Sequence, residues 1–258
     1  MEEFIIDLNN EERIKQLNTK EFAIPRLNWE VEIPLLIGQN TLDSMATNMR
    51  NKNCHDIISY ANEKLQNNIS IDGLENLIQQ EIKYYLDLDN ENKKNEKIII
   101  IFHLIQLWGG NAGRMFYFMN MPINFYEYKE LILFSLNENE PEKVLIELKK
   151  FIKSKKNNYI NIAFMTKHIS LWQRFGTNFK NPLPIYDSII AKNIMGIVTF
   201  DKKRKKWNGF TNNDWSSLLI YWKQMQEISK YLNVTTCQIE RQIFNHFRNQ
   251  DWTRNYGN

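Results

Sequence analysis

Several features that mark common protein classes are missing from this sequence of 258 residues. It has two cysteines, Cys54 and Cys237, and they form no Cys-x-x-Cys pair, so neither a disulfide framework nor a zinc site is expected. Neither the phosphate-binding loop nor the glycine-rich dinucleotide motif occurs. The four histidines show no metal-ligand spacing. We therefore predict a protein that uses no metal and no cofactor.

Long apolar runs are also missing. No stretch approaches the roughly 20 apolar residues that a membrane-spanning helix requires. The N-terminal residues 1–13 are acidic and lack the apolar centre of a signal peptide. We therefore expect a soluble, intracellular protein with no membrane partner, cytoplasmic and, in a bacterium, associated with the nucleoid. The net charge of +3 is compatible with nucleic acid but does not require it.

Glycine and proline are scarce, at 9 and 6 residues, which disfavours the many turns of an all-β fold. Apolar residues instead recur at spacings of three and four, which is typical of amphipathic helices. We predict one all-α domain over residues 1–258, with about nine or ten helices, an irregular segment at 1–40 and room for two lobes with a cleft between them. The expected helices cover residues 98–108, 113–119, 126–136, 141–152, 158–174 and 187–195, with earlier ones from residues 42 and 72 and later ones from residues 214 and 235.

Local signals refine several of these helices. The apolar helix at 98–108 is expected to be buried and central, and the charged stretch at 87–97 to be a connector. Asp72 is expected to cap its helix, and Thr235 with Gln238 to form a capping box.

One stretch carries the pattern that we associate with chemistry. Thr166 and Lys167 lie within an expected helix, and a connector with Pro182 and Pro184 leads to Asp187, which opens the next helix. Two neighbouring helices would thus direct one amine and one carboxylate toward the same cleft.

This arrangement resembles the helix-hairpin-helix DNA glycosylase superfamily, and most closely its 8-oxoguanine branch. The approach Pro182-Leu-Pro-Ile-Tyr-Asp187 is also similar to the proline-rich run before the aspartate of archaeal 8-oxoguanine enzymes. The resemblance implies that Lys167 is the nucleophile and that Asp187 is its electrostatic and proton-transfer partner. The sequence departs from the family at 161–165, where a Gly-x-Gly turn would bind a phosphate and no glycine occurs. The resemblance therefore implies an atypical hairpin.

The chemistry of glycosidic cleavage explains why these residue types are needed. Breaking the bond develops positive charge at C1′ of the sugar, which a nearby carboxylate stabilises. A neutral lysine amine can attack C1′ and form a Schiff base, after which the strand breaks by β-elimination. An ordinary lysine has a pKa of about 10.4, so roughly one in 10³ is neutral at pH 7. Burial among apolar neighbours lowers that pKa, and Phe164, Met165, Ile169 and Trp172 surround Lys167 in the sequence.

Further residues are candidates for holding the DNA. A flipped base needs stacking and hydrogen-bonding walls, for which the candidates are His168, Trp172, Phe175 and Tyr186; the alternative for each is core packing. The densest basic run, expected to contact the DNA backbone, comprises Lys202, Lys203, Arg204, Lys205 and Lys206. Arg114, in a glycine-rich turn, is a further candidate for a phosphate contact. The alternatives are a solvated loop and a structural turn.

Together these features predict a DNA glycosylase with lyase activity in base excision repair. Its partner would be double-stranded DNA carrying a damaged or modified base, 8-oxoguanine by default, and the protein would act as a monomer. One alternative is a non-catalytic nucleic-acid-binding protein that retains the fold. The other is a helical interaction module, in which Lys167 is a solvated lysine and Asp187 merely caps a helix.

Overall fold

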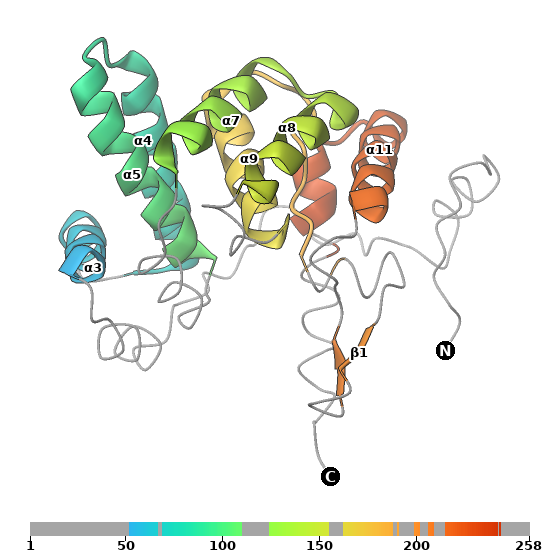
Figure 1. Ribbon diagram of the computed structural model, residues 1–258, viewed down its shortest axis with the longest axis horizontal. Helices are drawn as coiled ribbons and strands as arrows, with labels where there is room; N and C mark the ends of the chain where they lie inside the picture. The colour runs from blue at the N-terminus through green and yellow to red at the C-terminus, as the bar shows by residue number, and fades with distance from the viewer. Residues whose placement is uncertain are drawn as a thin grey trace. The chain divides into compact units, whose positions relative to one another are not determined.

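A computed structural model describes residues 52–66, 69–109, 124–154, 162–187, 190, 199–201, 206–208, 215–241 and 243. The predicted irregular segment at 1–40 and the predicted helix at 113–119 lie outside these residues. Within them the regular secondary structure is helical apart from two three-residue strands (Figure 1). The prediction of an all-α fold is thereby confirmed. None of the helices in the described part is long and apolar enough to cross a membrane.

Seven helices have defined bounds in the described part of the chain. They are α3 (Lys52–Lys64), α4 (Ile71–Asp87), α5 (Glu91–Trp108), α7 (Phe125–Asn137), α8 (Pro141–Lys153), α9 (Ile162–Gly176) and α11 (Trp215–Leu232). Residues 236–241 are also helical. The predicted capping box of this last segment is confirmed, because Gln238 N–H donates to Thr235 Oγ1 (3.2 Å) and Thr235 N–H donates to Gln238 Oε1 (2.9 Å).

The cap of α4 differs from the prediction. The sequence predicts Asp72 as the N-cap, but the N-cap is Ser70, two residues earlier, and the helix begins at Ile71. The Ser70 hydroxyl accepts the N–H of Gly73 at 2.9 Å, while Asp72 lies in the first turn. Both residues favour a helix start, since serine satisfies an unpaired N–H and a first-turn carboxylate interacts well with the helix dipole.

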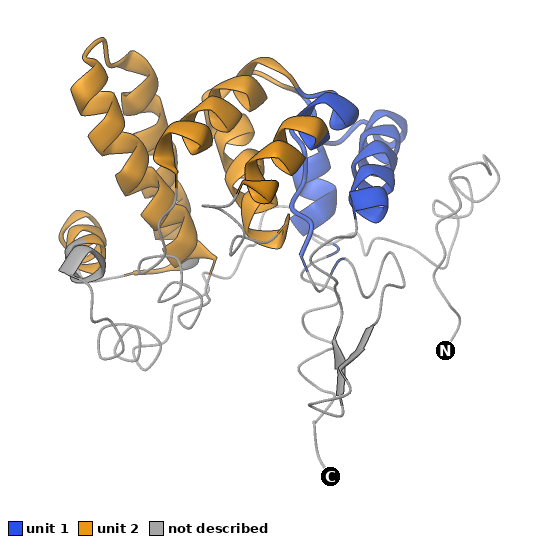
Figure 2. Ribbon diagram, viewed as in Figure 1, with its two compact units in different colours: residues 1–31, 139–145, 180–258 blue, residues 32–138, 146–179 orange. Residues whose placement is uncertain are grey.

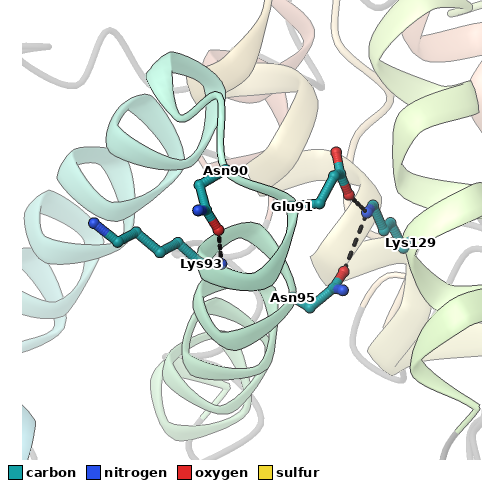
Figure 3. Close-up of polar contacts among 5 residues, drawn as sticks. All are labelled: Asn90, Glu91, Lys93, Asn95 and Lys129. Atoms are coloured by element: carbon teal, nitrogen blue, oxygen red, sulfur yellow. Dashed lines mark hydrogen bonds and ion pairs between the residues drawn. The ribbon is translucent and has the colours of Figure 1, made fainter.

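Helix α5 also begins earlier than the apolar pattern predicts. The stretch before Ile98 was expected to be a connector, but it is helical from Glu91 onward. Asn90 is the N-cap, and its side-chain oxygen accepts the N–H of Lys93 at 3.1 Å (Figure 3). This first part of the helix is polar, so hydrophobic periodicity does not detect it.

An interhelical ion pair holds this polar start in place. Lys129 of α7 donates to Glu91 (2.6 Å) and to Asn95 (3.1 Å), both on α5 (Figure 3). The Lys129 side chain is largely buried, at 16% exposure, whereas that of Glu91 is exposed at 68%. The contact therefore adds orientation more than stability, because solvent screens the charge of an exposed carboxylate.

The chain divides into two compact units (Figure 2). Unit 1 comprises residues 1–31, 139–145 and 180–258, and unit 2 comprises residues 32–138 and 146–179. In unit 2, helix α5 contacts α3, α4 and α9, and α9 also contacts α4 and α7. The apolar half of α5 is almost wholly buried between Ile101 and Leu107, which confirms the predicted central helix.

A short two-stranded ribbon is the one sheet in the described residues. Strand β1 (Thr199–Asp201) pairs antiparallel with β2 (Lys206–Asn208), and the register sets Phe200 opposite Trp207. The sequence predicts no strand here, because three residues are too few to show a period of two.

The core of unit 2 contains two buried histidines, His103 on α5 and His168 on α9. Phe102 lies against both rings: it stacks on His168 with centroids 4.7 Å apart and meets His103 edge-on at 5.3 Å. Burial lowers the pKa of His103 to about 4. Burial also lowers the pKa of His168, to which nearby His103 and Lys167 contribute. Both rings are therefore neutral in the folded protein at neutral pH.

This burial predicts acid-sensitive stability. Below about pH 6.5, the ordinary histidine pKa, these histidines become protonated in the unfolded chain but stay neutral in the folded chain. The free energy of unfolding therefore decreases as the pH is lowered. For His103, whose pKa is lowered from 6.5 to about 4, the full loss is roughly 3 kcal/mol. Urea unfolding at a series of pH values measures it. The variant His103→Gln should decline less steeply than wild type, and an equal decline would contradict the prediction.

Candidate active site

Lys167 occupies an unusual position on helix α9. Every residue from Ile162 to Gln173 is buried except Lys167, which is half-buried. A lysine on a solvated helix face would have exposed neighbours three and four residues away, but here Phe164 and Leu171 are buried. The side chain therefore crosses protein interior before its amine reaches the surface.

The amine ends at the C-terminus of helix α5. Lys167 Nζ lies 3.4 Å from the carbonyl oxygen of Gly109, the C-cap residue of α5. The same atom lies 5.4 Å from the centroid of the Phe164 ring. Both contacts attract a cation, since the helix C-terminus is the negative end of its dipole and an aromatic face is electron-rich. One side of the amine is thus fixed by protein atoms.

Two predicted base-pocket residues lie in the interior behind Lys167. His168 and Trp172 are fully buried, and their polar atoms bond to other side chains. The His168 ring nitrogens lie 2.8 Å from Tyr128 Oη and 2.8 Å from Gln106 Nε2. Trp172 Nε1 donates to Tyr128 Oη at 3.0 Å. In this arrangement neither side chain presents a surface to a base.

Phe175 lies further along α9 and is partly exposed. The guanidinium of Arg174 is 5.2 Å from the centroid of its ring. Arg174 also forms an ion pair with the buried Glu75 of α4 at 2.8 Å. Phe175 therefore belongs to the end of α9 that is tied to α4.

Asp187 lies in unit 1, after a segment without helix or strand, and is half-buried. Its Oδ1 accepts the N–H of Ile190 at 3.1 Å, which is the bond of an N-cap residue. This confirms the predicted cap. The negative charge of Asp187 also reaches Tyr221, whose pKa is raised chiefly by burial and then by Glu240 and Asp187.

The segment leading to Asp187 is held along its length. Residues 182–186 are all buried, and two of their carbonyl oxygens accept side-chain hydrogen bonds. Trp222 Nε1 of α11 donates to the Pro184 carbonyl at 2.8 Å, and the Thr236 hydroxyl donates to the Pro182 carbonyl. The predicted pocket residue Tyr186 is fully buried, with its ring 5.4 Å from that of Tyr221. Because proline has no N–H to donate, side chains hold these two residues through hydrogen bonds to their carbonyl oxygens.

The predicted backbone-binding residues lie mostly outside the described residues. Arg114 and Lys202 to Lys205 are not described, and Lys206 is the first residue of β2. Six lysines of the described helices are paired with carboxylates, which reduces the attraction of these six for phosphate. These pairs are Lys97–Glu81, Lys129–Glu91, Lys143–Glu140, Lys150–Glu147, Lys223–Glu142 and Lys230–Glu227.

Three residues near Lys167 were not predicted as part of the site: Gln106, Gly109 and Tyr128. Gln106 had a signal, since it is a polar residue inside an apolar run of α5. Tyr128 had none, because a tyrosine in an amphipathic helix looks like ordinary core. Within the described ranges, no group of three or more His, Cys, Asp or Glu side chains could hold a metal.

The cap bond of Asp187 can be separated from its charge. Asparagine caps a helix as well as aspartate does, whereas alanine cannot accept the Ile190 N–H. We expect Asp187→Ala to lower the free energy of unfolding by about 1 kcal/mol and Asp187→Asn to change it by a few tenths. Denaturant unfolding of both variants tests this. A large loss in Asp187→Asn would show that the charge itself stabilises the fold.

Comparison with known proteins adds no relative to this geometry. No protein-family model, no curated protein and no solved structure matches the chain.

Proposed function

We propose that this chain is a DNA glycosylase with lyase activity, in which Lys167 is the nucleophile and Asp187 its carboxylate partner. The observation that carries the proposal is the position of Lys167, which is the one half-buried residue in the buried stretch from Ile162 to Gln173. Lysine is among the residues least often buried, and burial of its ammonium group, unlike burial of its aliphatic stem, is costly, so a lysine in this stretch is unusual. The resemblance of Thr166–Asp187 to the 8-oxoguanine glycosylases supplies that role.

The proposed reaction uses these two groups in sequence. The neutral amine of Lys167 attacks C1′ of the extruded nucleotide, and the glycosidic carbon–nitrogen bond breaks with its electron pair leaving on the base. The base takes up a proton, which Asp187 can transfer from the attacking amine. Opening of the sugar ring, in which O4′ takes up a proton from water, then gives the Schiff base. Water removes a proton from C2′, and the 3′ phosphate leaves by β-elimination with the electron pair of the C3′–O bond. Asp187 also stabilises the positive charge on the sugar while the bond breaks.

The proposal places two requirements on the molecule. Lys167 of unit 2 and Asp187 of unit 1 must reach the same sugar carbon when DNA is bound. The amine must also leave the carbonyl of Gly109 to attack, and a distance of 3.4 Å marks a weak bond that costs little to break.

The proposed substrate is double-stranded DNA with an oxidised or otherwise modified base, 8-oxoguanine by default. Lys202, Lys203, Arg204, Lys205 and Lys206 would contact the phosphates, as would Arg114. Because His168 and Trp172 are buried with bonded polar atoms, we assign them to the support of Lys167 rather than to contact with the base. Partly exposed Phe175 remains a candidate for stacking.

Borohydride trapping tests the nucleophile. Reduction of a Schiff base between the protein and a lesion-containing duplex leaves a stable covalent adduct. We expect wild type to form the adduct and Lys167→Gln to form none while its duplex affinity stays nearly unchanged. The matched control is Lys83→Gln, which removes an exposed lysine of α4. An adduct in Lys167→Gln at the wild-type level would end the assignment.

The same assay tests the carboxylate. We expect Asp187→Asn, which keeps the helix cap, to release base at least 100-fold more slowly than wild type, in line with about 10² or more for an electrostatic stabiliser. DNA binding without base release or adduct in wild-type protein would instead support a non-catalytic nucleic-acid-binding protein. The absence of DNA binding would support an interaction module.

Salt dependence tests the basic run. Neutralising Lys202, Lys203, Arg204 and Lys205 to glutamine should reduce the slope of log affinity against log salt by about three to four, since each phosphate contact contributes roughly 0.9. The matched control neutralises Lys143, Lys150, Lys223 and Lys230, which changes the net charge equally but removes lysines already paired with carboxylates. Equal slopes in the two quadruple variants would contradict a specific role for the run.

A further inference from the structure

Four buried side chains form a continuous hydrogen-bonded chain beside Lys167, all of them within unit 2. Trp172 Nε1 lies 3.0 Å from Tyr128 Oη, which lies 2.8 Å from His168 Nδ1. His168 Nε2 lies 2.8 Å from the carboxamide of Gln106. The chain therefore links α7, α9 and α5, and each member is at most 1% exposed.

The chemistry of the donors restricts where the protons lie. An indole N–H can only donate, so Tyr128 Oη accepts from Trp172. Burial holds His168 neutral, so one of its ring nitrogens carries a proton and the other accepts. This leaves two possible proton orders along the chain, and they differ in how many buried groups stay unsatisfied.

In the first order, His168 carries its proton on Nδ1 and donates it to Tyr128, while the Gln106 amide donates to Nε2. The Tyr128 hydroxyl proton then has no acceptor, and the Gln106 oxygen is left without a donor. Two buried polar groups are unsatisfied, and each keeps the full cost of its removal from water.

In the second order, Tyr128 donates its proton to Nδ1, and His168 carries its own proton on Nε2. That proton is donated to the carboxamide oxygen of Gln106. A rotation of the amide by 180° exchanges its oxygen and nitrogen and brings the oxygen to this position. All three bonds then have one donor and one acceptor, and the amide NH₂ of Gln106 is the single group left over. Of the two orders, the second leaves fewer buried groups unsatisfied.

We propose that this proton-ordered chain positions Lys167 for attack, with Tyr128, His168 and Gln106 as positioning residues. The proposal rests on the function assigned to Lys167. His168 follows Lys167 on α9, and Gln106 lies one turn before Gly109 on α5. The bond from His168 to Gln106 and the bond from Lys167 to Gly109 thus join the same turns of the two helices. A shift of α9 along α5 would break both at once.

The chain offers a matched pair of variants. Tyr128→Phe removes the hydroxyl that joins Trp172 to His168. Tyr85→Phe removes another deeply buried hydroxyl of unit 2, one that bonds to none of the described residues, and keeps the edge-on ring contact with Trp172 at 5.2 Å. Both substitutions remove one oxygen, so they differ chiefly in whether that oxygen belongs to the hydrogen-bonded chain of Trp172, Tyr128, His168 and Gln106.

The proton order is read from histidine nitrogen resonances. In protein labelled with ¹⁵N-histidine, we expect His168 of wild type to show a protonated Nε2 and a bare Nδ1. Tyr85→Phe should keep this pattern, and Tyr128→Phe should lose the hydrogen-bond shift at Nδ1. A wild-type protein with its proton on Nδ1 would overturn the proton order. If Tyr128→Phe does not fold, Gln106→Met replaces it. In that variant the proton of the His168 ring should move from Nε2 to Nδ1.

The position of Lys167 is read without DNA by reductive ¹³C-methylation, which gives each lysine amine its own signal. The Lys167 signal, assigned by its loss in Lys167→Gln, should shift in Tyr128→Phe and stay in place in Tyr85→Phe. With DNA, Tyr128→Phe should slow single-turnover trapping by about 10-fold or more at unchanged duplex affinity, since small displacements of a reacting group are costly.

These readouts separate the two claims. A Lys167 signal that is unchanged in folded Tyr128→Phe overturns the positioning role, whatever the protein does to DNA. A wild-type protein that forms no adduct overturns the proposed function. Wild-type trapping rates in Tyr128→Phe overturn the positioning role and leave the glycosylase assignment intact.

Discussion

The burial of helix α9 on nearly every side is the constraint on which the rest of this account depends. A helix packed by α4, α5 and α7 has no face for a long cationic side chain, so Lys167 is forced to run along protein and to end where a carbonyl can receive it. Helix α5 supplies that carbonyl at its C-terminus, through Gly109. The Lys167 side chain is thus positioned by the packing of α9 and by its contact with the end of α5.

The carboxylate partner is fixed by a different means. Pro182 and Pro184 have no N–H to donate, and their carbonyls accept hydrogen bonds from Trp222 and Thr236. Asp187 then closes the segment by capping the next helix. A cap bond uses carboxylate geometry, whereas the proposed chemistry uses carboxylate charge. The two roles are compatible because one oxygen suffices for the cap.

The sequence predicted the helical class, the central position of α5 and the capping box at Thr235, because each depends on apolar spacing or on a local capping motif. The start of α5 was predicted wrongly, because its polar first part is held by the cap Asn90 and by Lys129 from another helix rather than by apolar packing. The sequence also assigned His168 to a base pocket, although the residue is buried and bonded to Tyr128 and Gln106. Partners that come from distant helices leave no mark on local periodicity, so no reading of α9 alone could have identified them.

The central claim is that one particular amine attacks the sugar, and peptide mapping of a borohydride-reduced complex tests it most directly. The protein would be reduced in the presence of a duplex with an abasic site, digested, and sequenced by mass spectrometry. The account predicts that the deoxyribose remnant is attached to Lys167. A remnant on another lysine or on the terminal amine would show that the buried placement of Lys167 serves the fold and not the reaction.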